Sequence, residues 1–367
     1  MFSPEQPYNA LPELPSGDSL TSPEIYKVLM PGARAIERLS TVAGSLPNPP
    51  LLSESVVLLE AKDSSEIENV VTTQNDLFAP TESRIDPMTK EVRNYADALR
   101  VGWNSIIDRP LDMPLMEEAC SIILGREMKV RRVPGTKLLN SATGDVVYTP
   151  PEGEDLLRRL LSNLFRWLHE DDEVDPIIKA AIAHYQFEAI HPFTDGNGRT
   201  GRILVVLYLA EQRLLRSPAL FLSSAILSNR EEYYQAIKNA TESKKLTSYL
   251  IWFLEVLHSA ANLSTTRAEN VEWSRNHVAK LITEIDQKML TPRLLDLVSS
   301  GPTTRARDLV DAGVVNSIST AHRWIKRLSE GEDAVLEPFG RVGREMVYWN
   351  SHVLEALSSE EPFDSKD

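Results

Sequence analysis

The sequence predicts a mainly α-helical protein that carries one small β-hairpin and ends in a winged-helix domain. Apolar residues recur at helical spacing along much of the chain, as in Ile178, Ile182, Tyr185 and Ala189. Short β-type runs separated by a turn occur at residues 133–149 and again near the C-terminus. The 367 residues are 42% hydrophobic and 25% charged, which is ordinary for a globular protein with a sizeable core.

Composition and charge narrow the classes of function. The formal net charge of −14 favours solubility and argues against a chain-wide surface for nucleic acid or acidic membranes, while leaving room for a local basic patch. Cys120 is the only cysteine, so no intrachain disulfide and no multi-cysteine metal site can form. The N-terminus lacks the pattern of a signal peptide, and no apolar run reaches the ~20 residues of a membrane span. We therefore expect a cytoplasmic protein in a reducing compartment.

The N-terminal region combines an extended arm with helices. About the first twenty residues are rich in Pro, Ser and Glu and are expected to be extended. A helical pattern begins at Ser53, breaks at 62–63 and resumes as a short second helix at Ser64. Ser65 and Glu68 have the S-x-x-E spacing of a capping box, which would place Ser65 at the start of that second helix.

The middle of the chain alternates between one hairpin and several helices. Residues 133–149 are expected to form two short strands with a turn between them, ended by Pro150-Pro151. The expected helices that follow are 154–169, 176–190, 199–214, 230–240 and 246–264, with a polar helix over 265–290 that links to the last segment.

The last segment has the order of a winged helix. Helices are expected at 294–299, 305–312 and 317–329, followed by a hairpin through 335–348. The third helix and the wing carry basic and polar residues that could meet DNA phosphates: Ser317, Thr320, His322, Arg323, Lys326, Arg327, Arg341 and Arg344. Acidic neighbours dilute this patch: Glu330, Glu332, Asp333, Glu337 and Glu345. DNA binding and docking to another protein therefore stay alternatives.

The string from His191 to Arg202 carries the strongest functional signal. Pro192 disfavours a helical conformation at His191, so the preceding helix should end there. Gly196 and Gly198 allow positive φ and a close approach of the backbone to a ligand. The apolar run that follows predicts a new helix. A glycine-containing turn that leads into a helix N-terminus is a site for anions.

Charged residues around this turn complete a site suited to nucleotide transfer. Arg199 and Arg202 are three residues apart, on the same side of the first helical turns, and two guanidinium groups there suit a polyphosphate. Asp195 could hold Mg²⁺ together with substrate phosphate oxygens. His191 is placed to take a proton from an incoming hydroxyl group. Each feature alone has a structural reading, but their combination within twelve residues favours a functional one.

The string resembles the signature of the Fic family, H-x-F-x-[D/E]-G-N-G-R-x-x-R, with every defined position matched. The resemblance spans about residues 5–260, with the 133–149 hairpin in the place of the family's target-docking flap. It implies a Fic-type helical core with a β-hairpin flap, in a layout that includes an inhibitory helix (about 64–70). The implied domains are an N-terminal helical region (1–110), a catalytic core (111–264), a linker helix (265–290) and a winged-helix domain (291–367).

The resemblance implies a protein adenylyltransferase that uses ATP and Mg²⁺. Such an enzyme moves AMP from ATP to a Ser, Thr or Tyr hydroxyl group of a target protein or of itself. His191 would be the general base, Asp195 would bind Mg²⁺, and Phe193 would anchor the loop. The implied ATP-binding residues are Gly196, Asn197, Gly198, Arg199, Thr200, Gly201, Arg202, Tyr233 and Tyr234, with the Asn197 side chain orienting the α-phosphate. Without this resemblance, Tyr233 and Tyr234 would be interpreted as residues of the hydrophobic core.

An inhibitory segment is implied by the same resemblance. Ser64, Glu68 and Asn69 fit the family's pattern [S/T]-x-x-x-E-[G/N]. Glu68 would then pair with Arg202 and occupy the site of the γ-phosphate, which would keep the activity low. Related enzymes can use the corresponding Glu to remove AMP, so the reverse reaction stays open. The capping box is the structural alternative for Glu68.

Other functions and partners complete the expectations. One rival is a regulator whose winged helix binds DNA while its helical part senses a nucleotide, and another is a transferase of the same fold that moves a different phosphate-containing group. We find no G-x-x-x-x-G-K-[ST] loop and no kinase signature, which argues against unrelated ATP chemistries. The target main chain is expected to add to the edge strand of the flap. A homodimer is expected from base rates alone.

Overall fold

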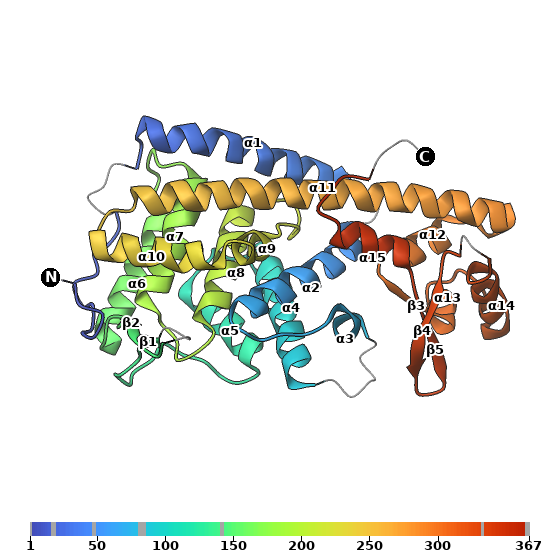
Figure 1. The fold of residues 1–367 in the computed structure, drawn as a ribbon, viewed down its shortest axis with the longest axis horizontal. Coiled ribbons are helices and arrows are strands. Elements are labelled where there is room, and N and C mark those ends of the chain that lie inside the picture. Colours follow the sequence, from blue (N-terminus) through green and yellow to red (C-terminus); the bar gives the residue numbers. More distant parts are fainter. Residues whose placement is uncertain are drawn as a thin grey trace.

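The computed structural model describes residues 2–15, 20–45, 49–79, 86–139, 143–331 and 334–363, and the side chains of 49–54 lie outside this description. The fold is mainly helical, as predicted. Figure 1 shows a large helical body and a smaller C-terminal unit, with one long helix running along both. No helix in the described part of the chain is long and apolar enough to cross a membrane.

The N-terminal arm leads into a helix that the sequence analysis missed. Residues 2–15 contain no helix, but Tyr8, Leu11 and Leu14 are buried against the body. Helix α1 (Pro23–Ser45) follows and lies along the long helix α11 (Figure 1). Pro31 lies inside α1, and an internal proline normally argues against a helix, yet the buried face of α1 holds it in place.

Helix α2 (Pro49–Ile67) corrects the prediction of two helices with a break at 62–63. The helix continues through these residues because its buried side chains, among them Leu59 and Ala61, pack on α4 and α9. Lys62 also forms an ion pair with Glu66, one turn further on, at 2.9 Å. Ser65 therefore lies in the last turn of α2 and is not the first residue of a new helix. The predicted capping box of Ser65 and Glu68 is wrong, since no helix begins there.

The central elements match the predicted order. Short helix α3 (Gln74–Phe78) precedes two helices that had no individual prediction, α4 (Pro87–Ser105) and α5 (Met113–Leu124). The predicted hairpin is confirmed as antiparallel strands β1 (Leu138–Leu139) and β2 (Val146–Tyr148). Residues 140–142 of this flap, with Ala142, lie outside the described residues. The next helices are α6 (Glu154–Leu168), α7 (Pro176–Ile190), α8 (Asn197–Glu211), α9 (Leu222–Leu227) and α10 (Arg230–Ser243).

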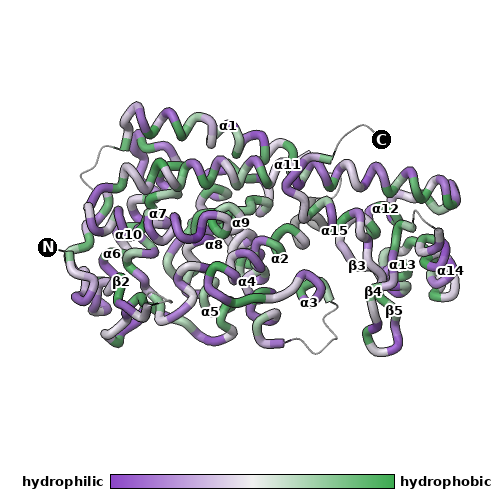
Figure 2. Tube along the Cα trace, in the orientation of Figure 1, coloured by the Kyte–Doolittle hydropathy of each residue, from purple (hydrophilic) through white to green (hydrophobic). Residues whose placement is uncertain are grey.

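Helix α11 (Thr247–Asp286) is a single helix of 40 residues, where a core helix and a separate linker helix were expected. The polar stretch that suggested a linker packs on both units: Ala268 and Val271 lie in the core of the body, and Val278 and Ile282 lie in the core of the C-terminal unit. The Ser264 hydroxyl donates to the Ala260 carbonyl at 2.6 Å, and the Arg267 guanidinium lies 4.3 Å from the centre of the Phe221 ring. Figure 2 shows hydrophobic and hydrophilic residues alternating along α11, as expected for a helix with one packed face.

The C-terminal unit contains the predicted helices and hairpin. After a short 3₁₀ turn (Gln287–Met289), its elements are α12 (Pro292–Ser299), β3 (Thr303–Arg305), α13 (Ala306–Asp311), α14 (Ile318–Leu328), β4 (Glu337–Val342) and β5 (Glu345–Trp349). Strand β3, which was not predicted, pairs with β5 to give an antiparallel sheet of order β3-β5-β4. This order is compatible with a winged helix. Glu332 and Asp333 lie outside the described residues.

The last helix returns to the body. Helix α15 (Ser351–Ser358) packs on α11, and its residues Val353, Ala356 and Leu357 are buried in the large core of the body. The C-terminal unit has an apolar core of its own, with residues such as Leu294, Leu309 and Ile325. The chain therefore leaves the body along α11, forms the C-terminal unit, and comes back to the body near its end.

Candidate active site

The loop between α7 and α8 forms where the sequence predicted it. Helix α7 ends at Ile190, and His191 follows in the left-handed conformation with φ 50° and ψ 61°. Its backbone N–H still donates to the Phe187 carbonyl, at 2.9 Å. Because Pro192 cannot continue a helix, the chain turns here and re-enters helix at Asn197, two residues earlier than expected.

A buried phenylalanine and an asparagine fix this loop. Phe193 is fully buried and contacts Phe187 edge to face, which agrees with its expected anchoring role. The Asn197 side-chain oxygen accepts from the Phe193 N–H at 2.8 Å, and its amide donates to the Phe193 carbonyl at 3.0 Å. The Asn197 side chain therefore braces the loop from inside, whereas the family resemblance implied that it would orient a phosphate.

The start of α8 is an uncapped helix N-terminus. Gly196 occupies the N-cap position with φ 79°, and no side chain caps the helix there. Gly198 was also expected to have positive φ, but it lies within the helix and does not. A Cβ atom at Gly198 would lie 2.2 Å from the Glu68 Oε1 atom, so a side chain here would displace the Glu68 carboxylate. A carboxylate thus lies against the helix end whose N–H groups attract anions.

Arg202, in the second turn of α8, binds this carboxylate. The guanidinium is fully buried and donates from Nε to the Ser64 hydroxyl and from Nη2 to the Ser64 carbonyl, both at 2.8 Å. Nη2 also lies 3.1 Å from Glu68 Oε1. Burial alone would lower the pKa of Arg202, but the charge of Glu68 raises it on balance, so the guanidinium stays charged. The Glu68–Arg202 pair implied by the family resemblance is present.

Arg199 is held by a different helix. It is buried, and its guanidinium forms an ion pair with Glu91 of α4 and a longer one with Asp195 at 3.7 Å. The two arginines of the motif lie three residues apart in the first turns of α8, as predicted, and bind separate carboxylates, from α4 and from the segment after α2. Any phosphate that contacts both must compete with these carboxylates.

Two other residues of the motif face the protein interior. The Thr200 hydroxyl donates to the Gly196 carbonyl at 2.8 Å within the first turn of α8. A Cβ atom at Gly201 would lie 2.7 Å from Glu188 Oε1 and 3.3 Å from His184 Nδ1. Gly201 therefore lies in the contact between α7 and α8, and Thr200 lies within the first turn of α8. Binding of ATP by these two residues stays a prediction.

The two tyrosines of α10 lie in different environments. Tyr233 is buried, and its hydroxyl group lies 3.1 Å from His184 Nε2, so its environment is that of a core residue. Tyr234 is 46% exposed and donates from its hydroxyl to the Ile67 carbonyl at 3.4 Å, beside the end of α2. Asn69 has φ 64°, and its side-chain oxygen accepts from Arg230 at 3.0 Å. Only Tyr234 therefore lies at the surface next to Glu68.

Asp195 is the residue best suited to a metal ion. Its side chain is 55% exposed, and its Oδ1 atom accepts from the Gly196 N–H at 2.6 Å. Mg²⁺ is commonly held by one carboxylate with substrate phosphate oxygens, and a single exposed carboxylate beside an anion site fits that mode. In the described part of the chain, no group of three or more His, Cys, Asp or Glu side chains could hold a metal ion.

His191 carries a neutral imidazole beside the flap. Burial lowers the pKa of His191 to about 4, and the positive charge of Arg131 contributes to the same direction. The ring is therefore neutral near pH 7 and can accept a proton. Arg131 and Glu91 were missed by the sequence analysis because their contacts are far apart in the chain. Adjacent arginines before the flap were the only available signal, and they do not distinguish buried Arg131 from exposed Arg132.

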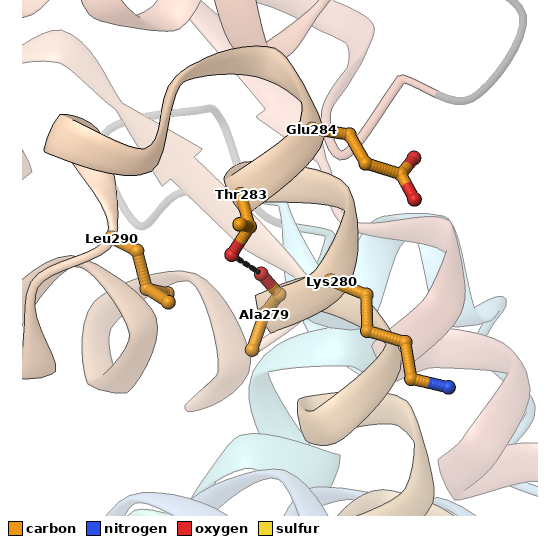
Figure 3. Close-up of a pocket in the computed structure, with 5 residues that line it drawn as sticks. All are labelled: Ala279, Lys280, Thr283, Glu284 and Leu290. Atoms are coloured by element: carbon orange, nitrogen blue, oxygen red, sulfur yellow. Dashed lines mark hydrogen bonds between the residues drawn. The ribbon is translucent and has the colours of Figure 1, made fainter.

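The basic face predicted on the third helix of the C-terminal unit is partly neutralised. Arg327 forms an ion pair with Asp286 at 2.7 Å, and Lys326 forms one with Glu330 at 3.6 Å. A surface pocket lies nearby, at the far end of α11 (Figure 3). In it the Thr283 hydroxyl donates to the Ala279 carbonyl at 2.8 Å. This pocket is remote from the loop of His191, and DNA binding stays a prediction.

The fold and the loop define a mainly helical protein with a candidate anion site at a helix N-terminus. Residues 26–104 match the model of the Fic/DOC family N-terminal region, and residues 115–209 match the model of the Fic/DOC family. Over 90% of its length the chain also resembles a Fic family protein from Desulfovibrio desulfuricans G20, of which it covers 96%, with a TM-score of 0.57 and 22% identity. Residues 26–104 and 115–209 therefore belong to the Fic/DOC family.

Two curated relatives carry the name protein adenylyltransferase. The chain is 29% identical over 201 residues to a probable protein adenylyltransferase of Aquifex aeolicus, a match that covers 50% of this chain and 57% of the relative. It is 37% identical over 92 residues to the protein adenylyltransferase fic-1 of Caenorhabditis elegans, covering 24% of this chain and 17% of the relative. The matches thus span about half of the first relative and less than a fifth of the second.

Proposed function

We propose that this protein is an adenylyltransferase that transfers AMP from ATP to a hydroxyl group of a protein. One observation carries the proposal. The Glu68 carboxylate lies against the uncapped start of α8 and binds fully buried Arg202, so an acidic group already occupies a position with the chemistry of a phosphate site. The family membership and the names of the relatives support the same reaction.

The proposed binding mode assigns the triphosphate to the loop and the start of α8. The backbone N–H groups after Gly196 would bind phosphate oxygens, and Arg199 and Arg202 would bind the phosphate chain once their carboxylate partners yield. Asp195 would hold Mg²⁺, which when bound would neutralise part of the phosphate charge. Tyr234 would border the nucleoside, because it is the exposed member of the tyrosine pair.

The proposed reaction is a displacement at the α-phosphorus. Neutral His191 takes the proton from the target hydroxyl group, whose oxygen forms a bond to the α-phosphorus of ATP. The bond from that phosphorus to the bridging oxygen breaks, and pyrophosphate leaves. The target main chain would pair with an edge of the β1–β2 flap, which lies beside His191 and would bring the hydroxyl group to the imidazole.

The same geometry supports the proposal that the wild-type protein is inhibited by its own Glu68. A γ-phosphate at Arg202 and the Glu68 carboxylate would compete for one guanidinium, and two like charges there repel. Ser64 holds Arg202 through two further hydrogen bonds, so the end of α2 and the motif form one unit. ATP would therefore bind productively only when Glu68 moves away.

A labelling experiment tests the proposed function. Wild type, Glu68→Gly, Glu66→Gly and the double variant Glu68→Gly/His191→Ala are incubated with Mg²⁺, cell lysate and ATP labelled at the α-phosphate. We expect protein-bound label to be strongest with Glu68→Gly, weak with wild type and the Glu66→Gly control, and absent from the double variant. If no protein is labelled, α-phosphate transfer is wrong, and γ-labelled ATP and DNA binding become the next tests.

A further inference from the structure

Arg131 is a buried arginine that connects the flap to the loop of His191. It is only 4% exposed, although it lies on a connecting segment between α5 and β1. Its Nε donates to the His191 carbonyl at 2.8 Å, and its Nη2 donates to the Pro151 carbonyl at 2.5 Å and to the Ile190 carbonyl at 3.3 Å. Its backbone N–H donates to the Pro192 carbonyl at 2.9 Å. One residue thus binds four backbone carbonyls.

The carbonyls that Arg131 binds belong to two functional segments. Arg131 and Pro151 flank the flap (133–149) on its two sides, so the guanidinium closes the base of the hairpin. Ile190, His191 and Pro192 form the turn in which His191 takes its left-handed conformation. A non-glycine residue with positive φ needs support from its surroundings, and Arg131 binds the carbonyls of this residue and of both its neighbours. The flap and the general base are therefore fixed to one side chain.

The guanidinium fork is the feature that makes this connection. Arg131 forms no ion pair with any carboxylate in the described part of the chain, and burial lowers the pKa of Arg131. Its planar group sends N–H donors in fixed, diverging directions, which a lysine ammonium cannot reproduce. A second hydrogen bond connects the flap to the end of α7, since the Tyr148 hydroxyl of β2 donates to the Ala189 carbonyl at 2.7 Å. Arg131 nevertheless is the residue that contacts both ends of the flap base and the His191 turn.

We infer that Arg131 is a positioning residue that sets the flap relative to His191, so that a main chain paired with the flap presents its hydroxyl group to the imidazole. This inference rests on the proposed adenylyl transfer. It assigns Arg131 no contact with ATP. Loss of its fork therefore slows the transfer step while the affinity for ATP stays the same, because only the distance and angle between target and base change.

The test compares three substitutions in the Glu68→Gly background: Arg131→Lys, Arg131→Met and the matched control Arg132→Ala. Arg132 is the exposed neighbour, whose side chain is 73% exposed and pairs with Glu154. Initial rates of protein labelling give kcat and the KM for ATP, and thermal unfolding checks the fold. We expect kcat to fall about 10–100-fold with Arg131→Lys while the KM for ATP stays within about twofold. Arg132→Ala should match the background.

A pH profile separates positioning from general damage. Arg131 and Asp195 are the charged groups that act on the His191 ring, with opposite effects on its pKa. Arg131→Met removes a positive charge and should move the acidic limb of the rate profile to higher pH, whereas Arg131→Lys keeps the charge and should move it less. If Arg131→Met does not fold, the kcat and the KM for ATP of Arg131→Lys test the inference.

Each remaining outcome has one meaning. Equal kcat for Arg131→Lys and its background overturns the inference and leaves the proposed function intact. An unfolded Arg131→Lys variant, or an equal loss in ATP affinity, shows a role in the fold and also overturns it. Absence of any label with Glu68→Gly alone removes the proposed function, and the inference with it.

Discussion

Glu68 and Arg202 lie 134 residues apart in the sequence and meet in a hydrogen-bonded ion pair of 3.1 Å. The pair is asymmetric, because Arg202 is fully buried whereas the Glu68 side chain is 33% exposed. Removing the carboxylate leaves a buried cation without its charged partner, while Ser64 still accepts two of its hydrogen bonds. Loss of the Glu68 carboxylate therefore leaves the positive charge of buried Arg202 uncompensated, and an anion that binds Arg202 would compensate it again.

Glu68→Gln should destabilise the free protein and make it more responsive to ATP. The substitution keeps an acceptor near Arg202 but removes the charge, so we expect a loss of about 1–2 kcal/mol in the free energy of unfolding. ATP with Mg²⁺ should then raise the Tm more for Glu68→Gln than for wild type. The measurement is thermal unfolding with and without ATP, with Glu66→Gln as the control. Equal ATP-induced shifts in all three proteins would show that Glu68 does not compete with ATP.

Gly198→Ala should couple to Glu68 energetically. A Cβ atom at this position would lie 2.2 Å from Glu68 Oε1, so one of the two must move, and overpacking of this kind costs about 1–3 kcal/mol. In the Glu68→Gly background this clash is absent, and only Arg202 Nη1, 3.1 Å from the added Cβ atom, has to shift slightly, so the cost of alanine should be smaller by about 1 kcal/mol or more. Urea unfolding of the four proteins of this double-mutant cycle measures the coupling. Additive effects would contradict the contact.

The local parts of the site could be predicted from the sequence, since they depend on neighbouring residues. Pro192 ends α7, Gly196 turns the chain, and the apolar run after it starts α8. The contacts that hold these elements are not local. Arg199 meets Glu91 of α4, and Arg131 meets the His191 turn, and no spacing in the sequence indicates either contact.

The errors in the fold came from reading charged or helix-breaking residues in isolation. Residues 62–63 suggested a break, yet α2 continues up to Ile67 because its buried face packs on α4 and α9. Because α2 is continuous up to Ile67, Glu68 directly follows its end. Helix α2 itself packs against α9. Helix α1 had no individual prediction, and it contains Pro31 because its packing along α11 outweighs the hydrogen bond that the proline removes.

Glu60→Gln should stabilise the protein increasingly as the pH rises. Glu60 is fully buried on α2, and the Ser223 N–H of α9 donates to its Oε2 at 3.0 Å. Burial raises the pKa of Glu60 from 4.5 to about 8. Between these values the folded state binds a proton that the unfolded state releases, so wild-type stability falls as the pH rises through this window. Glutamine carries no such proton.

The free energy of unfolding of Glu60→Gln relative to wild type should therefore grow by about 1 kcal/mol per pH unit between pH 5 and 8. Urea unfolding at four pH values measures this slope. Glu66→Gln, at a surface position of the same helix, controls for the loss of one carboxylate. A difference that does not change with pH would mean that Glu60 is ionised in the folded protein.

The rate of adenylyl transfer should be insensitive to pH over an unusually wide range on the acidic side. Burial and the charge of Arg131 lower the pKa of His191 to about 4, so the imidazole stays neutral, and able to accept a proton, from pH 8 down to about pH 5. Below pH 4 the rate should fall about tenfold per pH unit as the ring becomes protonated. Initial labelling rates of Glu68→Gly at saturating ATP and Mg²⁺ give this profile. Enzyme held at each pH and assayed again at pH 7 controls for unfolding. A midpoint near 6.5, the value of an unperturbed histidine, would mean that water reaches the ring and that neither burial nor Arg131 acts on the base.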